Sequence, residues 1–162
     1  MIDDIHSPEI QTVLSVWRPY VNAITDWQAR VKNVTAKTTG CGPLYELGNP
    51  LGRSTESLAI ADMRKVKYAQ PHYHTGGETE IYVVIAGSGR VVVGGSVSQL
   101  QKDSVLVIPP DTAHYALPDP AGGLVLAVIN TPPFKLENNI DVTETDRAHR
   151  YDHEQFLALT QN

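Results

Sequence analysis

Apolar residues in this chain come in short runs separated by glycine, proline and aspartate. The run from Ile81 to Ile85 is β-branched and aromatic, as is typical of a buried strand. Gly87-Ser88-Gly89 is expected to end that strand, and Gly94-Gly95 to form a hairpin turn, because glycine tolerates positive φ. Further strands are predicted at residues 31–37, 57–67, 90–93, 97–101, 104–108, 114–117 and 124–130. Many short strands joined by such turns predict an all-β barrel or sandwich.

The two ends of the chain show helical patterns instead. Ser7 as N-cap and Pro8 at the first helical position predict a helix start. The apolar side of that helix would consist of Ile10, Val13, Leu14 and Trp17. Asp152 is predicted to cap a short C-terminal helix, with an apolar side made of Phe156, Leu157 and Leu159.

A length of 162 residues fits one domain with a substantial core. The arm that precedes the barrel is expected to pack Trp27 against the main body. Residues 38–53 are rich in glycine and proline and are expected to form a long irregular connection. The expected parts of this single domain (1–162) are an N-terminal arm (1–54), a barrel core (about 55–133) and a C-terminal segment (134–162).

Composition excludes some partners. The formal net charge of −5 argues against a sequence-independent grip on nucleic acid, which needs clustered Lys and Arg. No apolar run approaches the roughly 18 residues that would suggest a membrane span. The acidic start, Met1 to Asp4, lacks the pattern of a secretory signal, so a cytoplasmic protein is expected. Cys41 is the one cysteine, which rules out an intramolecular disulfide.

The candidate chemistry is concentrated at residues 72–80 and 114. His72 and His74 lie two apart, so on an extended backbone both imidazoles point to the same face. A glycine turn then leads to Glu78 and Glu80, whose equal parity leaves open which of them joins the histidines. The stretch DSVLVIPPDTAH delivers His114 after a proline turn, in which Asp111 is expected to adopt a left-handed conformation. Three imidazoles and one carboxylate suit a divalent transition metal.

These motifs resemble those of the cupin superfamily. Its first motif has an HxH pair, a glutamate and, seven positions later, a glycine, which match His72, His74, Glu80 and Gly87. Its second motif, G(x)5PxG(x)2H(x)3N, falls on Asp103, Pro109, Asp111, His114 and Pro118, so both glycines are aspartates and the asparagine is a proline. These departures lie in turns and leave the metal set intact. The resemblance therefore implies His72, His74, Glu80 and His114 as ligands.

As a cupin, the chain would be a single-domain double-stranded β-helix, a jelly-roll barrel with short helical segments at both ends, and a homodimer. It would hold one divalent transition metal (Fe, Mn, Ni or Zn) and bind a small molecule. The family includes oxygenases, sugar isomerases and epimerases, and also non-catalytic binding proteins, among which fold does not select. An enzyme is our first hypothesis, with a metal-held ligand that is not turned over as the alternative.

Two further side chains are candidates for catalysis. Tyr82 has the parity of Glu80 and should share its inward face, where its hydroxyl could orient a substrate. Glu78, nearer the glycines, is expected to be more mobile and closer to the barrel mouth, as a partner of a metal ligand or a proton-transfer group. Tyr115, next to His114, could also orient a substrate, but packing in the core or at the rim is the favoured interpretation of both tyrosines.

The two glutamates can be separated by substitution. Glu80 directly precedes the apolar run, where a packed strand would fix its rotamer as a metal ligand requires. We expect Glu80→Gln to lose most of the bound metal and Glu78→Gln to keep it. Elemental analysis of metal per chain measures both. Loss in Glu78→Gln alone would place the ligand two residues earlier.

Overall fold

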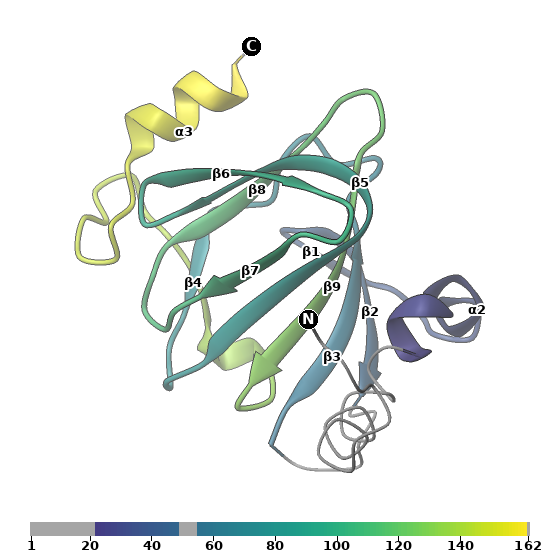
Figure 1. Ribbon diagram of the computed structural model, residues 1–162. Coiled ribbons are helices and arrows are strands. Elements are labelled where there is room, and N and C mark those ends of the chain that lie inside the picture. Colours follow the sequence, from purple (N-terminus) through teal and green to yellow (C-terminus); the bar gives the residue numbers. More distant parts are fainter. Residues whose placement is uncertain (1–21, 49–54, 162) are drawn as a thin grey trace, which may run out of the picture.

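The computed structural model describes residues 22–48 and 55–161, and the helix predicted from Ser7 lies outside them. Ten strands form one curled antiparallel structure (Figure 1). They are β1 (Lys37–Thr39), β2 (Gly42–Gly48), β3 (Ser57–Asp62), β4 (His72–His74), β5 (Thr79–Val93), β6 (Ser96–Gln101), β7 (Val105–Ile108), β8 (His114–Pro118), β9 (Leu124–Thr131) and β10 (Asn139–Asp141). This is the double-stranded β-helix barrel expected from the sequence.

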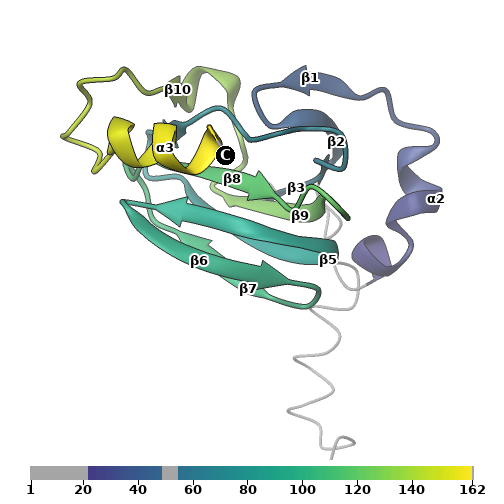
Figure 2. The same ribbon diagram turned by 90° about the horizontal axis from the view of Figure 1, so that it is seen from above.

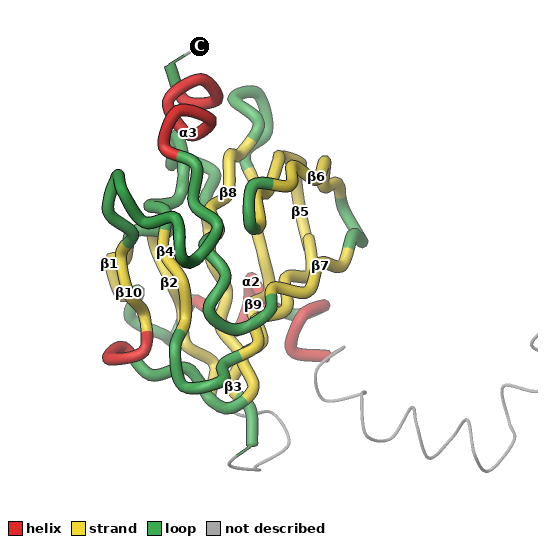
Figure 3. The backbone as a smooth tube through the Cα atoms, turned by 90° about the vertical axis from the view of Figure 1, so that its left-hand side faces the viewer, coloured by secondary structure: helices red, strands yellow, loops and turns green. Residues whose placement is uncertain are grey.

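The barrel consists of two facing sheets that share β5. One sheet runs β1-β2-β3-β9 into the first half of β5, where β7 also pairs. The other joins the second half of β5 to β6 and β8, and continues through β4 to β10 (Figure 3). Between the sheets lies a core that includes Tyr82, Val84, Val91, Leu126 and Val128.

Short helices cover the outside of the barrel on opposite sides, as Figure 2 shows from above. Helix α2 (Trp27–Val31) buries Trp27 against Leu58 and Ile60, which confirms the packing expected for that residue. Helix α3 (His153–Thr160) packs Phe156 beside Tyr115. Its N-cap is Asp152, whose Oδ1 accepts a hydrogen bond from the Gln155 amide at 3.1 Å, as predicted. A three-residue 3-10 helix, η1 (Leu136–Asn138), precedes β10. No helix in the described part of the chain is long and apolar enough to cross a membrane.

Two predictions about the N-terminal arm are wrong. Of residues 31–37, only Lys37 lies in a strand: α2 ends at Val31, and a turn leads to β1. Packing of α2 on the sheet outweighs the strand preference of the valines there. Residues 38–53 are not wholly irregular, since they hold the β1–β2 hairpin up to Gly48. Its glycines lie at the turn and at a register shift opposite β3, where they do not interrupt pairing.

Strand β3 ends at Asp62, five residues before the end of the predicted strand 57–67. The expected break at Gly87-Ser88-Gly89 is also wrong. Strand β5 is 15 residues long and runs through these three residues without a break. Its register against β9 shifts between Val84 and Ala86. Gly87 has φ +75 and lies so close to Gly123 that a Cβ would overlap the Gly123 carbonyl oxygen. This glycine therefore lets β5 bend from one sheet into the other without ending.

Replacing Gly87 with alanine should destabilise the fold strongly. An alanine at positive φ costs about 1–2 kcal/mol, and an overpacked backbone contact adds about 1–3 kcal/mol. Gly95→Ala is the matched control, because Gly95 also has positive φ (+82) but nothing lies within 4 Å of its added Cβ. Urea unfolding should show a clearly larger decrease in the free energy of unfolding for Gly87→Ala than for Gly95→Ala. Equal losses would show that the contact with Gly123 does not constrain β5.

Candidate metal centre

The structure brings the four predicted ligands together inside the barrel. His72 and His74 come from β4, Glu80 from the start of β5 and His114 from the first position of β8. His72 and His114 are direct partners in the ladder. One ligand atom from each of the four residues lies within 4.8 Å of the others, and all four side chains are buried. The left-handed turn predicted before His114 is present, with Asp111 at φ 53.

The outer nitrogens of the three rings are held by other groups. His72 Nδ1 lies 2.7 Å from the Gln70 carbonyl oxygen, and His114 Nδ1 lies 3.0 Å from that of Thr112. A carbonyl oxygen only accepts, so both Nδ1 atoms carry a proton, and each Nε2 is left to face the other candidate ligands. His74 Nδ1 faces Glu78 Oε1 at 3.4 Å. Such partners orient metal-binding imidazoles.

The inner atoms fit a cation. His114 Nε2 lies 3.0 Å from Glu80 Oε2, and His74 Nε2 lies 3.4 Å from the same oxygen. All three atoms are buried without a hydrogen-bond partner. Two lone-pair atoms at 3.0 Å repel each other unless a proton or a metal ion lies between them, and buried polar atoms without partners are costly. The donor set is therefore suited to a divalent metal that all four residues share.

The pKa values of His72 and Glu80 agree with this role. The pKa of His74 is raised instead: burial lowers it, but the carboxylates of Glu80 and Glu78 outweigh burial, so a proton competes with a metal at this imidazole. Burial, with the neighbouring His114, lowers the pKa of His72 to about 3, so this imidazole is neutral. Burial alone would raise the pKa of Glu80, but the imidazoles of His114 and His74 hold it well below its usual range. A neutral imidazole and an ionised carboxylate are the forms that bind metal.

Glu78 lies at the back of the cluster. The expectation that it is mobile and near the mouth is wrong, because its side chain is completely buried. Asn130 on β9 fixes both carboxylates: its Nδ2 donates to Glu78 Oε1 at 2.8 Å and to Glu80 Oε1 at 3.2 Å. Burial raises the pKa of Glu78. Asn130 was not a predicted site residue, because only the pairing of β9 with β5, between residues 50 apart in the chain, brings it there.

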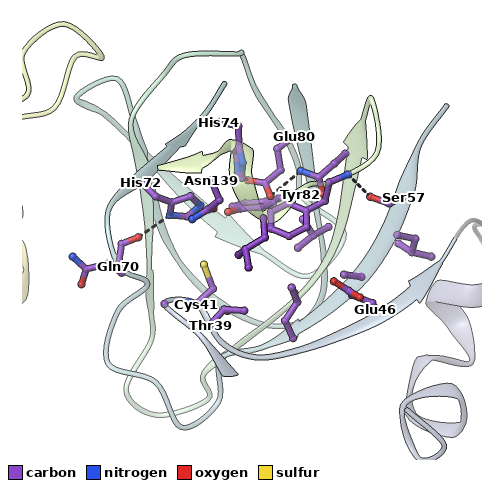
Figure 4. A pocket seen from close by; sticks show the side chains of 18 of the residues that line it. Thr39, Cys41, Glu46, Ser57, Gln70, His72, His74, Glu80, Tyr82 and Asn139 are labelled. Carbon is purple, nitrogen blue, oxygen red and sulfur yellow. Dashed lines mark hydrogen bonds and ion pairs between the residues drawn. The ribbon is translucent and has the colours of Figure 1, made fainter. Parts of the chain in front are cut away.

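A cavity of about 530 Å³ opens beside the cluster (Figure 4). His72, His74 and Glu80 lie at one end of it, and Glu46 and Ser57 lie at the other. Cys41, which was not predicted as a site residue, also lines it from the β1–β2 turn. Burial, with the carboxylates of Glu80 and Asp141, raises the pKa of this thiol to about 12. The space is of the size that small-molecule sites have.

The tyrosines divide between the two sides of the sheet. Tyr82 lines the cavity, as predicted. Burial, with the charge of Glu80, raises its pKa well above the usual value, so its hydroxyl stays protonated and can donate a hydrogen bond. Tyr115 faces the other way, into a cluster with Tyr151 and Phe156. Its hydroxyl is not available to a ligand in the cavity, and packing explains the residue.

Comparison with known proteins identifies the family. The family model described as an AraC-like ligand binding domain matches residues 56–162. The chain belongs to this family. The AraC-like domain is of the cupin type, which confirms the resemblance seen in the sequence. Its members are named for ligand binding, in agreement with the cavity. No curated protein matches the chain.

Solved structures agree on the fold. Streptomyces PAC13 with uridine superimposes with a TM-score of 0.57 at 14% identity, over 69% of this chain and 86% of that chain. A protein from Planctomyces limnophilus gives a TM-score of 0.56 at 26% identity, over 68% of this chain and 91% of that one. Both structures share the barrel architecture of this AraC-like domain.

The low pKa of His72 predicts how the stability of the metal-free protein depends on pH. Its pKa in the folded protein, about 3, lies below the ordinary 6.5. Between these two pH values the unfolded chain therefore binds a proton at His72 and the native state does not. The free energy of unfolding should therefore fall as the pH drops from 6.5 towards 3. The free energy of unfolding is measured with urea in EDTA at about pH 7 and about pH 5. Its decrease between the two pH values should be smaller for His72→Gln than for the wild type. Equal losses would mean that His72 is not neutral in the native state.

Proposed function

We propose that this AraC-like domain holds one divalent transition metal (Fe, Mn, Ni or Zn) through His72, His74, Glu80 and His114, and acts as an enzyme on a small molecule. The observation that carries the proposal is the convergence of unpaired, buried lone pairs beside an open cavity. A purely structural metal would need no such space.

The side chains around the cluster have separate roles in this proposal. A metal bound there would supply Lewis-acid polarisation of a ligand oxygen or, with a redox-active ion, oxygen chemistry. Glu80 contributes negative charge, and Glu78 orients His74 through its Nδ1. Tyr82 is the candidate catalytic residue that reaches the cavity, as a hydrogen-bond donor to the substrate. Glu78 remains a candidate for holding a proton behind His74, since its pKa is raised.

Isomerase- or lyase-type chemistry and oxygenation remain the two candidate reactions. PAC13 is described as a nucleoside dehydratase, which is one example of a protein of this fold that acts on a small polar molecule. In the present cavity a polar end holds the histidines, and apolar side chains such as Leu44 and Val128 line the wall. A substrate with oxygen atoms at one end fits both features.

The alternative is a binding domain that does not turn its ligand over. The family description itself favours it, because it names ligand binding and no reaction. Both functions would use the same metal and the same cavity. They differ in the fate of the ligand, which is recovered unchanged from a binding domain.

The test begins with metal content. Protein purified without chelators or a nickel column should carry close to one transition-metal ion per chain by elemental analysis. His114→Gln should lose most of it, because one of four ligands is gone. Tyr115→Phe is the matched control and should keep it, since this neighbouring side chain faces away from the cluster. Equal metal in all three proteins would contradict the proposed ligand set.

The same metal-loaded protein then separates enzyme from binding domain. Metabolites that raise its melting temperature are incubated with it and analysed by mass spectrometry. Conversion that disappears in Tyr82→Phe and in His114→Gln supports the enzyme. Ligands that bind with metal dependence and return unchanged support the binding domain.

A further inference from the structure

The charges on the cavity wall indicate which ligands it accepts. Among residues 22–48 and 55–161, the lining contains no Lys or Arg, and its only basic groups are His72 and His74. It does contain three carboxylates, Glu46, Glu80 and Asp141. Sites for phosphate or for several carboxylates normally supply Arg, Lys or backbone amides at a helix N-terminus.

Nearby basic groups do not change this picture. Lys37 pairs with Glu46 at 2.6 Å, so it offsets that carboxylate and is not a free cation in the wall. Lys135 lies between Phe134 and Leu136, which both line the cavity. Its own backbone is extended, so its side chain points away from the side to which its neighbours point. With Glu46 offset and Glu80 a candidate metal ligand, the remaining negative charge of the wall is carried mainly by Asp141. Asp141 pairs with His72 in the β4–β10 ladder.

The remaining wall is apolar or uncharged. Leu44, Val128 and Phe134 give one apolar side, and Thr38, Thr39, Gln70 and Asn139 offer neutral donors and acceptors. We propose that the ligand of this cavity is an uncharged or cationic molecule, with hydroxyl or carbonyl oxygens at one end and an apolar face, and that phosphorylated and polycarboxylate compounds are excluded. The inference rests on the proposed function only in that it takes the end of the cavity with the histidines as the metal site. The charge of the wall is the same whether or not the ligand is turned over.

Cys41 provides a probe that needs no knowledge of the ligand. It is the one cysteine of the chain and it lies on the cavity wall. The carboxylates of Glu80 and Asp141 act on its sulfur, as its raised pKa reflects together with burial. Reagents that share one reactive group but differ in charge can therefore be compared by the rate at which they modify Cys41. The differences between these rates report the electrostatic selectivity of the cavity.

The experiment measures modification of Cys41 by methyl methanethiosulfonate and by its trimethylammonium-ethyl and sulfonatoethyl analogues, with a small neutral cysteine derivative as the reference thiol. The whole chain is used, both after chelation and with added Zn²⁺, and mass spectrometry follows the reaction. The quantity of interest is the ratio of the rate with the cationic reagent to the rate with the anionic one. This ratio should be at least about tenfold larger for Cys41 than for the reference thiol, the scale on which charged clefts focus ions. A ratio equal to that of the reference, or a preference for the anion, overturns the proposal. Failure of even the neutral reagent to react overturns it too, because the cavity would then be closed to solutes.

Variants identify the source of the selectivity. Asp141→Asn should lower the cation-to-anion ratio several-fold. Glu137→Gln removes the same charge from an exposed glutamate that does not line the cavity, and it should leave the ratio unchanged. An equal drop in both would mean that overall charge, and not the wall, sets the ratio, which contradicts the proposal. Metal content is measured on the same samples, so a failure of the proposed metal site is distinguished from a failure of the charge selection.

Discussion

Strand β5 is the constraint on which the barrel and its centre both depend. It pairs with β7 and β9 along its first half and with β6 and β8 along its second, so neither sheet is complete without it. The bend between the halves requires a glycine at position 87. Glu80 and Tyr82 lie in the first half and face inward. A candidate metal ligand and a cavity residue therefore occupy the strand with the most hydrogen-bonded neighbours, which gives them fixed positions.

The centre itself works against stability when no cation is bound. Glu78, Glu80 and three imidazoles are buried close together, and several of their polar atoms have no hydrogen-bond partner. Asn130 relieves part of this crowding by donating to both carboxylates from one amide nitrogen. Sites at which local rules of burial are broken are those where function is expected. The apolar core around Val84, Val91 and Leu126 carries the fold despite this cluster.

Much of this arrangement could be predicted from local sequence. The HxH spacing, the following apolar run and the proline turn before His114 are features of neighbouring residues, and they led to the four clustered side chains. What was missed depends on pairing between distant segments. Asn130 reaches the glutamates only through the β5–β9 ladder, and Cys41 reaches the cavity only because β2 pairs with β3. The β1–β2 hairpin was concealed by glycine and proline, which usually mark loops; here the glycines lie at the turn and at a register shift, and Pro43, within β2, pairs with Thr38.

The pairing of β4 has a consequence for the order in which the chain is made. This three-residue strand carries His72 and His74, yet it pairs with β8 only at His72 and His114. Along its whole length it pairs with β10, from Asn139 to Asp141. During synthesis, the two histidines leave the ribosome well before the segment that holds their strand in place. A nascent chain thus has all four candidate ligands before it can fix their geometry, so a metal site made of them would be complete only in the finished protein.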